Sequence, residues 1–201
     1  MNKRLIALAL SAVMSITSYA DTSLVARALE NDDVKAAEIA FNGLSLEEKQ
    51  SIEGQIFSGR ILLQKDKTKE AFDYFEELRD DDTENSDVNY YLGVSAVIMA
   101  QKASIFSKLG YAEDFLEAME KTLKLKPDHE DALNTLIGFH LGAPSIAGGD
   151  TNKALTYAKQ LQSFNKEQGY EQLANVYWQT EKADLAEQTL LEGLKEFPES
   201  A

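Results

Sequence analysis

The spacing of small and large apolar residues near the C-terminus constrains the fold of this chain more than any other feature. In residues 167–201, these residues fall on one face of each of two successive helical segments: Tyr170, Leu173, Ala174, Tyr177, Ala186, Leu190 and Gly193. Small side chains at Ala174 and Ala186 allow two antiparallel helices to approach closely, while larger neighbours fill the space beside them. Pro198 then closes the unit, because proline cannot continue a helix. The segment is therefore predicted to form a helical hairpin.

The same spacing recurs upstream, which indicates internal repeats of about 34 residues. Residues 52–85 carry a matching set: Gly59, Leu62, Ala71, Phe75 and Leu78. Two further units cover residues 86–130 and 131–165, and each has additional residues between its two halves. The first helix of unit 131–165 places three residues at the matching positions: Ile137, Gly138 and Leu141. Residues 21–45 form a degenerate cap. No segment shows sustained two-residue alternation, so strands are not expected.

This pattern resembles that of tetratricopeptide repeat proteins. The last unit matches it position by position, with Gly193 standing where a small alanine is usual, and the match is weakest before Ile52. The resemblance implies an all-α fold, a right-handed α-solenoid of about five antiparallel helical hairpins. Stacked hairpins bury a continuous core only against their neighbours, so residues 21–201 are expected to form a single domain.

Capping signals agree with these boundaries. Asp33, Asp128 and Asp150 each precede a helical pattern, where a carboxylate can accept hydrogen bonds from the free amides of the first turn. Ser45, followed three residues later by Glu48, has the spacing of a capping box. These residues are therefore predicted to mark helix starts.

Residues 1–20 have the composition of a secretory signal peptide. Lys3 and Arg4 precede an apolar run of about 12 residues, shorter than the roughly 20 that span a bilayer. Small side chains at Ser18 and Ala20 fit cleavage after Ala20. The chain has no cysteine, so it can form neither a disulfide nor a lipid-modified cysteine. A periplasmic or secreted protein without a stable membrane anchor is expected.

Charge and chemistry favour binding over catalysis. With 34 acidic and 20 basic side chains, the formal net charge is -14, which disfavours nucleic acid and favours a basic partner. His129 and His140 lie outside any spacing typical of a metal site or of a serine nucleophile. The acidic run 80–87 lacks the glycine and glutamate of a calcium-binding loop. No enzymatic activity, cofactor or metal site is therefore predicted.

By the resemblance, a concave groove is lined by the first helix of each hairpin. The residues expected to face it are Ile56, Arg60, Leu63, Tyr90, Val94, Val97, Thr135, Phe139, Glu171, Asn175 and Trp178. Some members of the family grip a terminal carboxylate with basic and amide side chains, but here only Arg60 and Asn175 suit that clamp. Trp178, the only tryptophan, is either an exposed binding anchor or a core residue covered by a neighbouring loop.

Two insertions separate the first and second helices of consecutive hairpins, and we expect both on the same edge. Residues 101–110 contain Lys102 and Lys108, and residues 142–150 read G-A-P-S-I-A-G-G-D. Insertions that collect on one face of a solenoid are commonly its binding face. Alternatively, the first insertion only lengthens two helices and the second forms a wide turn. His140 beside the second insertion is either a site residue or structural.

These observations predict an exported scaffold or adaptor that binds a protein or peptide through the groove or the insertion edge. The groove residues expected to contact the partner are Arg60, Tyr90, Val94, Phe139, Asn175 and Trp178. The alternative is a periplasmic small-ligand binding component of a transport-related system. In that alternative, Lys102, Lys108 and His140 would contact an anion at the insertion edge.

Overall fold

The computed structural model describes residues 22–80 and 84–200, so the predicted signal peptide at residues 1–20 lies outside the described residues. All regular elements in the described part are helical. The α-helices are α1 (Thr22–Glu30), α2 (Val34–Gly43), α3 (Leu46–Gln50), α4 (Ile52–Gln64), α5 (Thr68–Asp80), α6 (Ser86–Lys102), α7 (Ile105–Leu125), α8 (Glu130–Gly142), α9 (Thr151–Phe164), α10 (Lys166–Gln179) and α11 (Ala183–Glu196). Two short 3-10 helices, η1 (Ser145–Ala147) and η2 (Pro198–Ser200), complete the set.

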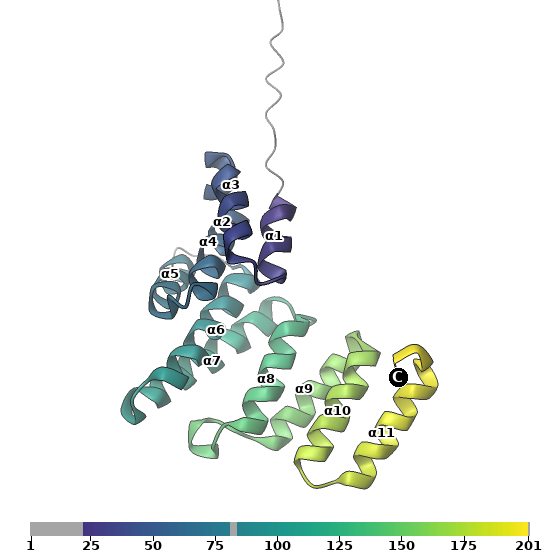
Figure 1. The fold of residues 1–201 in the computed structure, drawn as a ribbon. Helices are drawn as coiled ribbons and strands as arrows, with labels where there is room; N and C mark the ends of the chain where they lie inside the picture. The colour runs from purple at the N-terminus through teal and green to yellow at the C-terminus, as the bar shows by residue number, and fades with distance from the viewer. Residues whose placement is uncertain (1–21, 81–83, 201) are drawn as a thin grey trace, which may run out of the picture.

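Successive α-helices pair into hairpins: α1 with α2, α4 with α5, α6 with α7, α8 with α9, and α10 with α11. The short helix α3 lies between the first two pairs in the chain. The hairpins follow one another in space in the same order as in the sequence (Figure 1). Helices of neighbouring hairpins also pack together, as α5 does on α6 and α9 on α10. The predicted all-α fold, an α-solenoid of helical hairpins, is confirmed.

Apolar side chains form a core that continues from one hairpin to the next. Phe75 of α5, Leu92 of α6 and Phe115 of α7 are almost completely buried in its largest cluster. A second cluster joins α8, α9 and α10 around Leu161, and the ring of Tyr157 packs against both clusters. Each large buried side chain contributes roughly 1.5–3 kcal/mol of hydrophobic free energy. The alanines predicted to allow close approach of helices are buried as well: Ala71, Ala174 and Ala186.

Three of the predicted helix starts are confirmed and one is wrong. Asp33 and Asp150 accept hydrogen bonds from first-turn amides, and Ser45 forms the predicted capping box with Glu48. At α8, however, the N-cap is His129, whose Nδ1 accepts a hydrogen bond of 3.3 Å from the Ala132 amide. Asp128 lies one residue too early, because the His129 ring is buried beside Tyr90, with 4.8 Å between ring centroids.

The two insertions have different structures. The first adds length to helices: α6 continues to Lys102 and α7 begins at Ile105, so that only Ala103 and Ser104 are non-helical between them. The second is a wide turn that contains η1 and the left-handed Gly148, whose φ is 96°. The first insertion therefore lengthens two helices and the second forms a wide turn, as the alternative interpretation predicted. Their position in the fold decides whether they also form a site.

Helix α8 is shifted by one residue relative to the predicted repeat. The predicted units begin at 86 and 131, which are 45 positions apart, whereas the buried residues of α8 lie 44 positions after those of α6: Leu133 after Asn89, Leu136 after Leu92, Ile137 after Gly93 and His140 after Ala96. Either register satisfies the apolar periodicity, because Leu136 and Ile137 are both large and apolar. In consequence, Asn134 and Gly138 take the groove positions that were predicted for Thr135 and Phe139.

Two glycines test the importance of close helix packing. A methyl group at Gly59 would overlap the buried ring of Phe75, whereas Gly110 on α7 faces open space. We expect Gly59→Ala to lower the free energy of unfolding by about 1–3 kcal/mol through overpacking, and Gly110→Ala to raise it by up to about 1 kcal/mol through helix propensity. Urea denaturation followed by circular dichroism measures both changes. Similar effects of the two substitutions would contradict this packing.

Candidate functional site

The two insertions and the groove meet at one cavity of about 480 Å³, which we call the edge cavity. It lies where α6, α7, α8 and the turn after α8 come together. Its lining residues are Val97, Ala100, Gln101, Lys108, Ala112, Asn134, Thr135, Gly138, Phe139, Gly142, Ala143, Pro144 and Ala147. Three predicted groove residues, Val97, Thr135 and Phe139, therefore border the same cavity as both insertions.

The wall of the edge cavity is apolar and has room for a side chain. Val97 and Phe139 supply its large apolar surfaces, and the Phe139 ring is held by Phe115, with 4.5 Å between ring centroids. A Cβ atom added at Gly138 or Gly142 would have no neighbour within 4 Å. An apolar side chain of a partner could occupy this space without displacing the helices.

Polar groups at the edge cavity are few and placed at particular points. The side-chain oxygen of Asn134 is buried and has no hydrogen-bond partner among the described residues. A buried acceptor without a donor costs about 1–3 kcal/mol, and an N–H group of a ligand would relieve this cost if the side chain turned toward it. Lys108 lines the same cavity from α7. The cavity can thus combine an apolar anchor with a hydrogen-bond donor from the bound molecule.

A second hollow, which we call the acidic pocket, lies one helical turn from the edge cavity along α8. It has a volume of about 470 Å³ and is lined by Asp87, Tyr90, Tyr91, Lys126, Asp128, His129, Glu130 and Asp131. Thr135 lines the edge cavity, and its hydroxyl donates a hydrogen bond of 2.7 Å to the carbonyl oxygen of Asp131. His129 Nε2 lies 3.2 Å from a carboxylate oxygen of Asp87 and lowers the pKa of that carboxyl group. The two hollows are lined by different residues, and their chemistry differs.

Three other predicted groove residues, Arg60, Val94 and Ile56, do not line the acidic pocket. The Arg60 guanidinium lies 5.2 Å from the ring centroid of Tyr91, and burial raises the pKa of the Tyr91 phenol to about 12. Val94, one turn from Tyr90 on α6, is half-buried against the core. Ile56 differs from the expectation: it is only 7% exposed, because it packs into the core cluster beside Phe72.

The residues of the predicted anion site do not come together. The Lys102 ammonium forms an ion pair with Asp66 and hydrogen-bonds with Thr68, at the turn that precedes α5. His140 is buried, with its Nδ1 2.9 Å from the carbonyl oxygen of Gly148 and its ring stacked on Tyr157. Only Lys108 lines the edge cavity. The arrangement therefore does not favour the small-anion alternative.

The last hairpin holds two predicted groove residues away from these hollows. Trp178 of α10 is 67% exposed, so its side chain is not covered by a neighbouring loop. Asn175, one turn earlier on the same helix, is also exposed. Neither residue lines the edge cavity or the acidic pocket. They present a separate surface of the solenoid.

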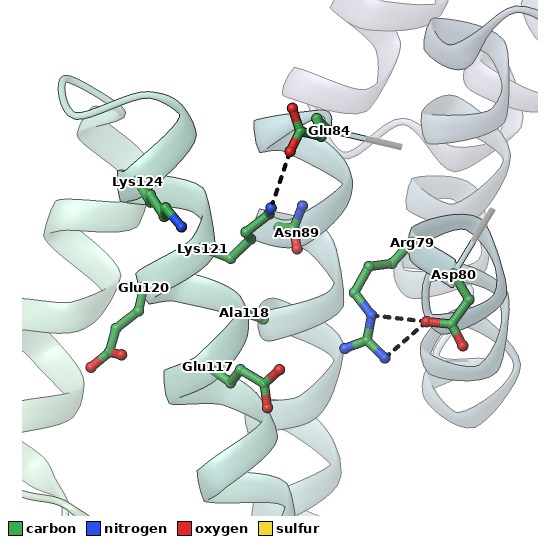
Figure 2. Close-up of a pocket in the computed structure, with 9 residues that line it drawn as sticks. All are labelled: Arg79, Asp80, Glu84, Asn89, Glu117, Ala118, Glu120, Lys121 and Lys124. Atoms are coloured by element: carbon green, nitrogen blue, oxygen red, sulfur yellow. Dashed lines mark hydrogen bonds and ion pairs between the residues drawn. The ribbon is translucent and has the colours of Figure 1, made fainter. Parts of the chain in front are cut away.

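A further cavity of about 490 Å³ is lined by residues of α5, α6 and α7 and by Glu84, which precedes α6 (Figure 2). Two of its basic side chains are already paired: Arg79 with Asp80 at 3.2 Å, and Lys121 with Glu84 at 3.7 Å. The other charged side chains that line it are Glu117, Glu120 and Lys124. Because acidic and basic groups nearly balance, this cavity has no dominant charge with which to select a ligand. We do not assign a site there.

The sequence analysis did not assign Asn134 and Gly138 to the groove, because of the one-residue shift in α8. Gly142 belongs to the second insertion, which was predicted either as a binding edge or as a wide turn. A polar residue and two glycines within one helix of apolar periodicity were a weak signal of a hollow groove. Within the described residues, no group of acidic, histidine or cysteine side chains is suited to hold a metal ion, and no helix has the length and hydropathy needed to cross a membrane.

Comparison with known proteins supports the tetratricopeptide fold. The tetratricopeptide repeat family model matches residues 96–129, which span the end of α6 and the whole of α7. A thermophilic tetratricopeptide protein from Thermus thermophilus is 18% identical, with a TM-score of 0.67 over 88% of this chain and 90% of that chain. No curated protein shows a significant match.

Two other solved structures have the same architecture at low identity. The MamA protein is 14% identical, with a TM-score of 0.58 over 89% of this chain and 90% of that chain. YrrB, described as a tetratricopeptide protein with an unusual peptide-binding site, is 16% identical, with a TM-score of 0.53 over 90% of this chain and 89% of that chain. At these identities the likeness shows the fold alone.

His140 predicts a pH dependence of stability near the edge cavity. Burial lowers the pKa of its imidazole below the ordinary 6.5, and the charge of Lys153 lowers it further. The carboxylates of Asp150 and Glu120 raise the pKa but do not outweigh this effect. The unfolded chain therefore binds the proton more readily than the folded chain. Stability is fully present above about pH 6.5 and falls as the pH drops below it.

The test is to measure urea midpoints between about pH 7.5 and about pH 5 for the natural protein and for His140→Asn. Asparagine can still donate a hydrogen bond to the Gly148 carbonyl, but it does not titrate. We expect a shallower loss of stability in the variant over this interval. Parallel profiles for the two proteins would show that His140 is not the responsible group.

Proposed function

We propose that this protein is a non-catalytic scaffold that binds a segment of a partner protein, with an apolar side chain of that segment held in the edge cavity. One observation carries the proposal: the groove helices α6 and α8 and both insertions line the same open, apolar hollow. Burial of one large aliphatic or aromatic side chain there would contribute roughly 1.5–3 kcal/mol. After a turn of its side chain, the unpartnered oxygen of Asn134 would accept a hydrogen bond from the same segment.

The proposal includes export. The composition of residues 1–20 supports it, and the partner would then be met in the periplasm or outside the cell. YrrB, a tetratricopeptide protein with an unusual peptide-binding site, is consistent with a peptide-like ligand on this architecture. The small-ligand alternative receives no comparable support, since Lys102 and His140 are engaged in internal contacts away from Lys108.

Filling the edge cavity should block binding without unfolding the protein. Gly138→Leu places a good helix-forming residue into open space, so helix α8 should become no less stable while the cavity becomes occupied. Peptides that are first selected on the natural protein from a random display library serve as the probe. We expect their affinity for Gly138→Leu to fall about tenfold or more, a loss of about 1.4 kcal/mol, in fluorescence anisotropy.

The matched control is Gly110→Leu on α7. Gly110 also faces open space, but it lies about 200° around the helix from Lys108 and does not line the edge cavity. This variant should bind the peptides like the natural protein, and thermal melts should show both variants folded. Peptides that bind Gly138→Leu as tightly as Gly110→Leu would refute the assignment of the site.

A further inference from the structure

The edge cavity and the acidic pocket form one track along α6 and α8. Tyr90 and Val97 lie seven residues apart on α6, about 10.5 Å along the helix axis. Tyr90 lines the acidic pocket and Val97 lines the edge cavity. On α8, Asp131 lines the acidic pocket and Thr135, one turn later, lines the edge cavity. A single bound segment can therefore reach both hollows at once.

The acidic pocket has more negative charge than its own basic groups compensate. Four carboxylates line it, against the single ammonium group of Lys126, and His129 is engaged with Asp87. Neither Asp128 nor Asp131 takes part in an ion pair within the described part of the chain. Arg60 is nearby, but its guanidinium lies over the ring of Tyr91. A cation from a partner would find unpaired carboxylates beside an aromatic ring, which is a favourable setting for a guanidinium or ammonium group.

The unpartnered Asn134 oxygen indicates the conformation of the bound segment. Within a helix, backbone N–H groups beyond the first turn are already bonded to carbonyls of the same helix, so a helical ligand has no free backbone donor to offer in its middle. An extended segment leaves its backbone N–H groups free to donate. Asn134 lines the edge cavity, and a turn of its side chain would bring this buried acceptor to such a donor, so an extended partner is favoured.

We propose that the partner is an extended segment in which a large apolar residue and a lysine or arginine are three residues apart. An extended segment in the polyproline II conformation has three residues per turn and rises about 3.1 Å per residue. Side chains three residues apart therefore lie on the same face, about 9 Å apart, close to the separation of the two hollows along α6. The apolar side chain occupies the edge cavity, and the basic side chain lies among Asp128, Glu130 and Asp131. This inference rests on the proposed function and adds the sequence chemistry of the partner.

The experiment selects peptides from a random twelve-residue display library on the full mature chain, at low and at high salt. On the natural protein, we expect enrichment of a large apolar residue with Lys or Arg at the third position before or after it. A triple variant, Asp128→Asn with Glu130→Gln and Asp131→Asn, should lose the basic preference and keep the apolar one. In direct binding, replacing the basic residue of a selected peptide by glutamine should weaken binding to the natural protein about tenfold and to the triple variant less than about twofold.

A control triple on α11, Asp184→Asn with Glu187→Gln and Glu192→Gln, changes net charge equally and also removes an acidic side chain from the first turn of a helix. It should select the same peptides as the natural protein. Two outcomes would overturn the inference and leave the proposed function standing. In the first, the enriched peptides need Gly138 but lack a basic residue at this spacing. In the second, the preference for a basic residue survives in the variant with Asp128→Asn, Glu130→Gln and Asp131→Asn. Enrichment that is unchanged in Gly138→Leu would overturn both.

Discussion

The structure depends on the close approach of the two helices within each hairpin, with a large side chain of one helix packed against the backbone of the other. Phe75 lies on Gly59, and Met119 lies on Gly93, with its methyl carbon 2.9 Å from where a Cβ atom would stand. Both large side chains are completely buried. Because each hairpin leaves an apolar face uncovered, this contact becomes stable only when the next hairpin packs on it.

In the fourth hairpin the large packed residue lies on the first helix and the small ones on the second, the reverse of the contacts at Gly59 and Gly93. The edge cavity forms beside this hairpin. Ile137 occupies the place of Gly93, and the facing positions of α9 are the small residues Ala154 and Ala158, all of which are fully buried. The glycine of α8 is displaced by one residue onto the groove side, where nothing packs on it. The hollow is therefore a consequence of how α8 packs, with the lengthened α6 and α7 as its other walls.

Internal ion pairs decide which charges remain available to a partner. Lys102, although it lies in an insertion, joins α6 to the turn before α5 through Asp66 and Thr68. Arg60 is held over Tyr91. With these basic groups engaged inside the molecule, the groove between α6 and α8 has apolar surface at one end and unpaired carboxylates at the other. Within the groove, the overall excess of acidic residues is therefore concentrated in the unpaired carboxylates at one end.

The sequence by itself determined the class of fold, because the spacing of Ala174, Ala186 and their large neighbours is a local property that periodicity reveals. It also located the insertions and most helix caps, which depend on residues a few positions apart. Only the tertiary structure decided which face of α8 is buried, since Leu136 and Ile137 allow two registers and contacts with α7, α9 and α10 select one. The same holds for the burial of His140, the ion pair of Lys102 and the free space at Gly138: each depends on residues that are distant in the chain and meet only when the hairpins stack.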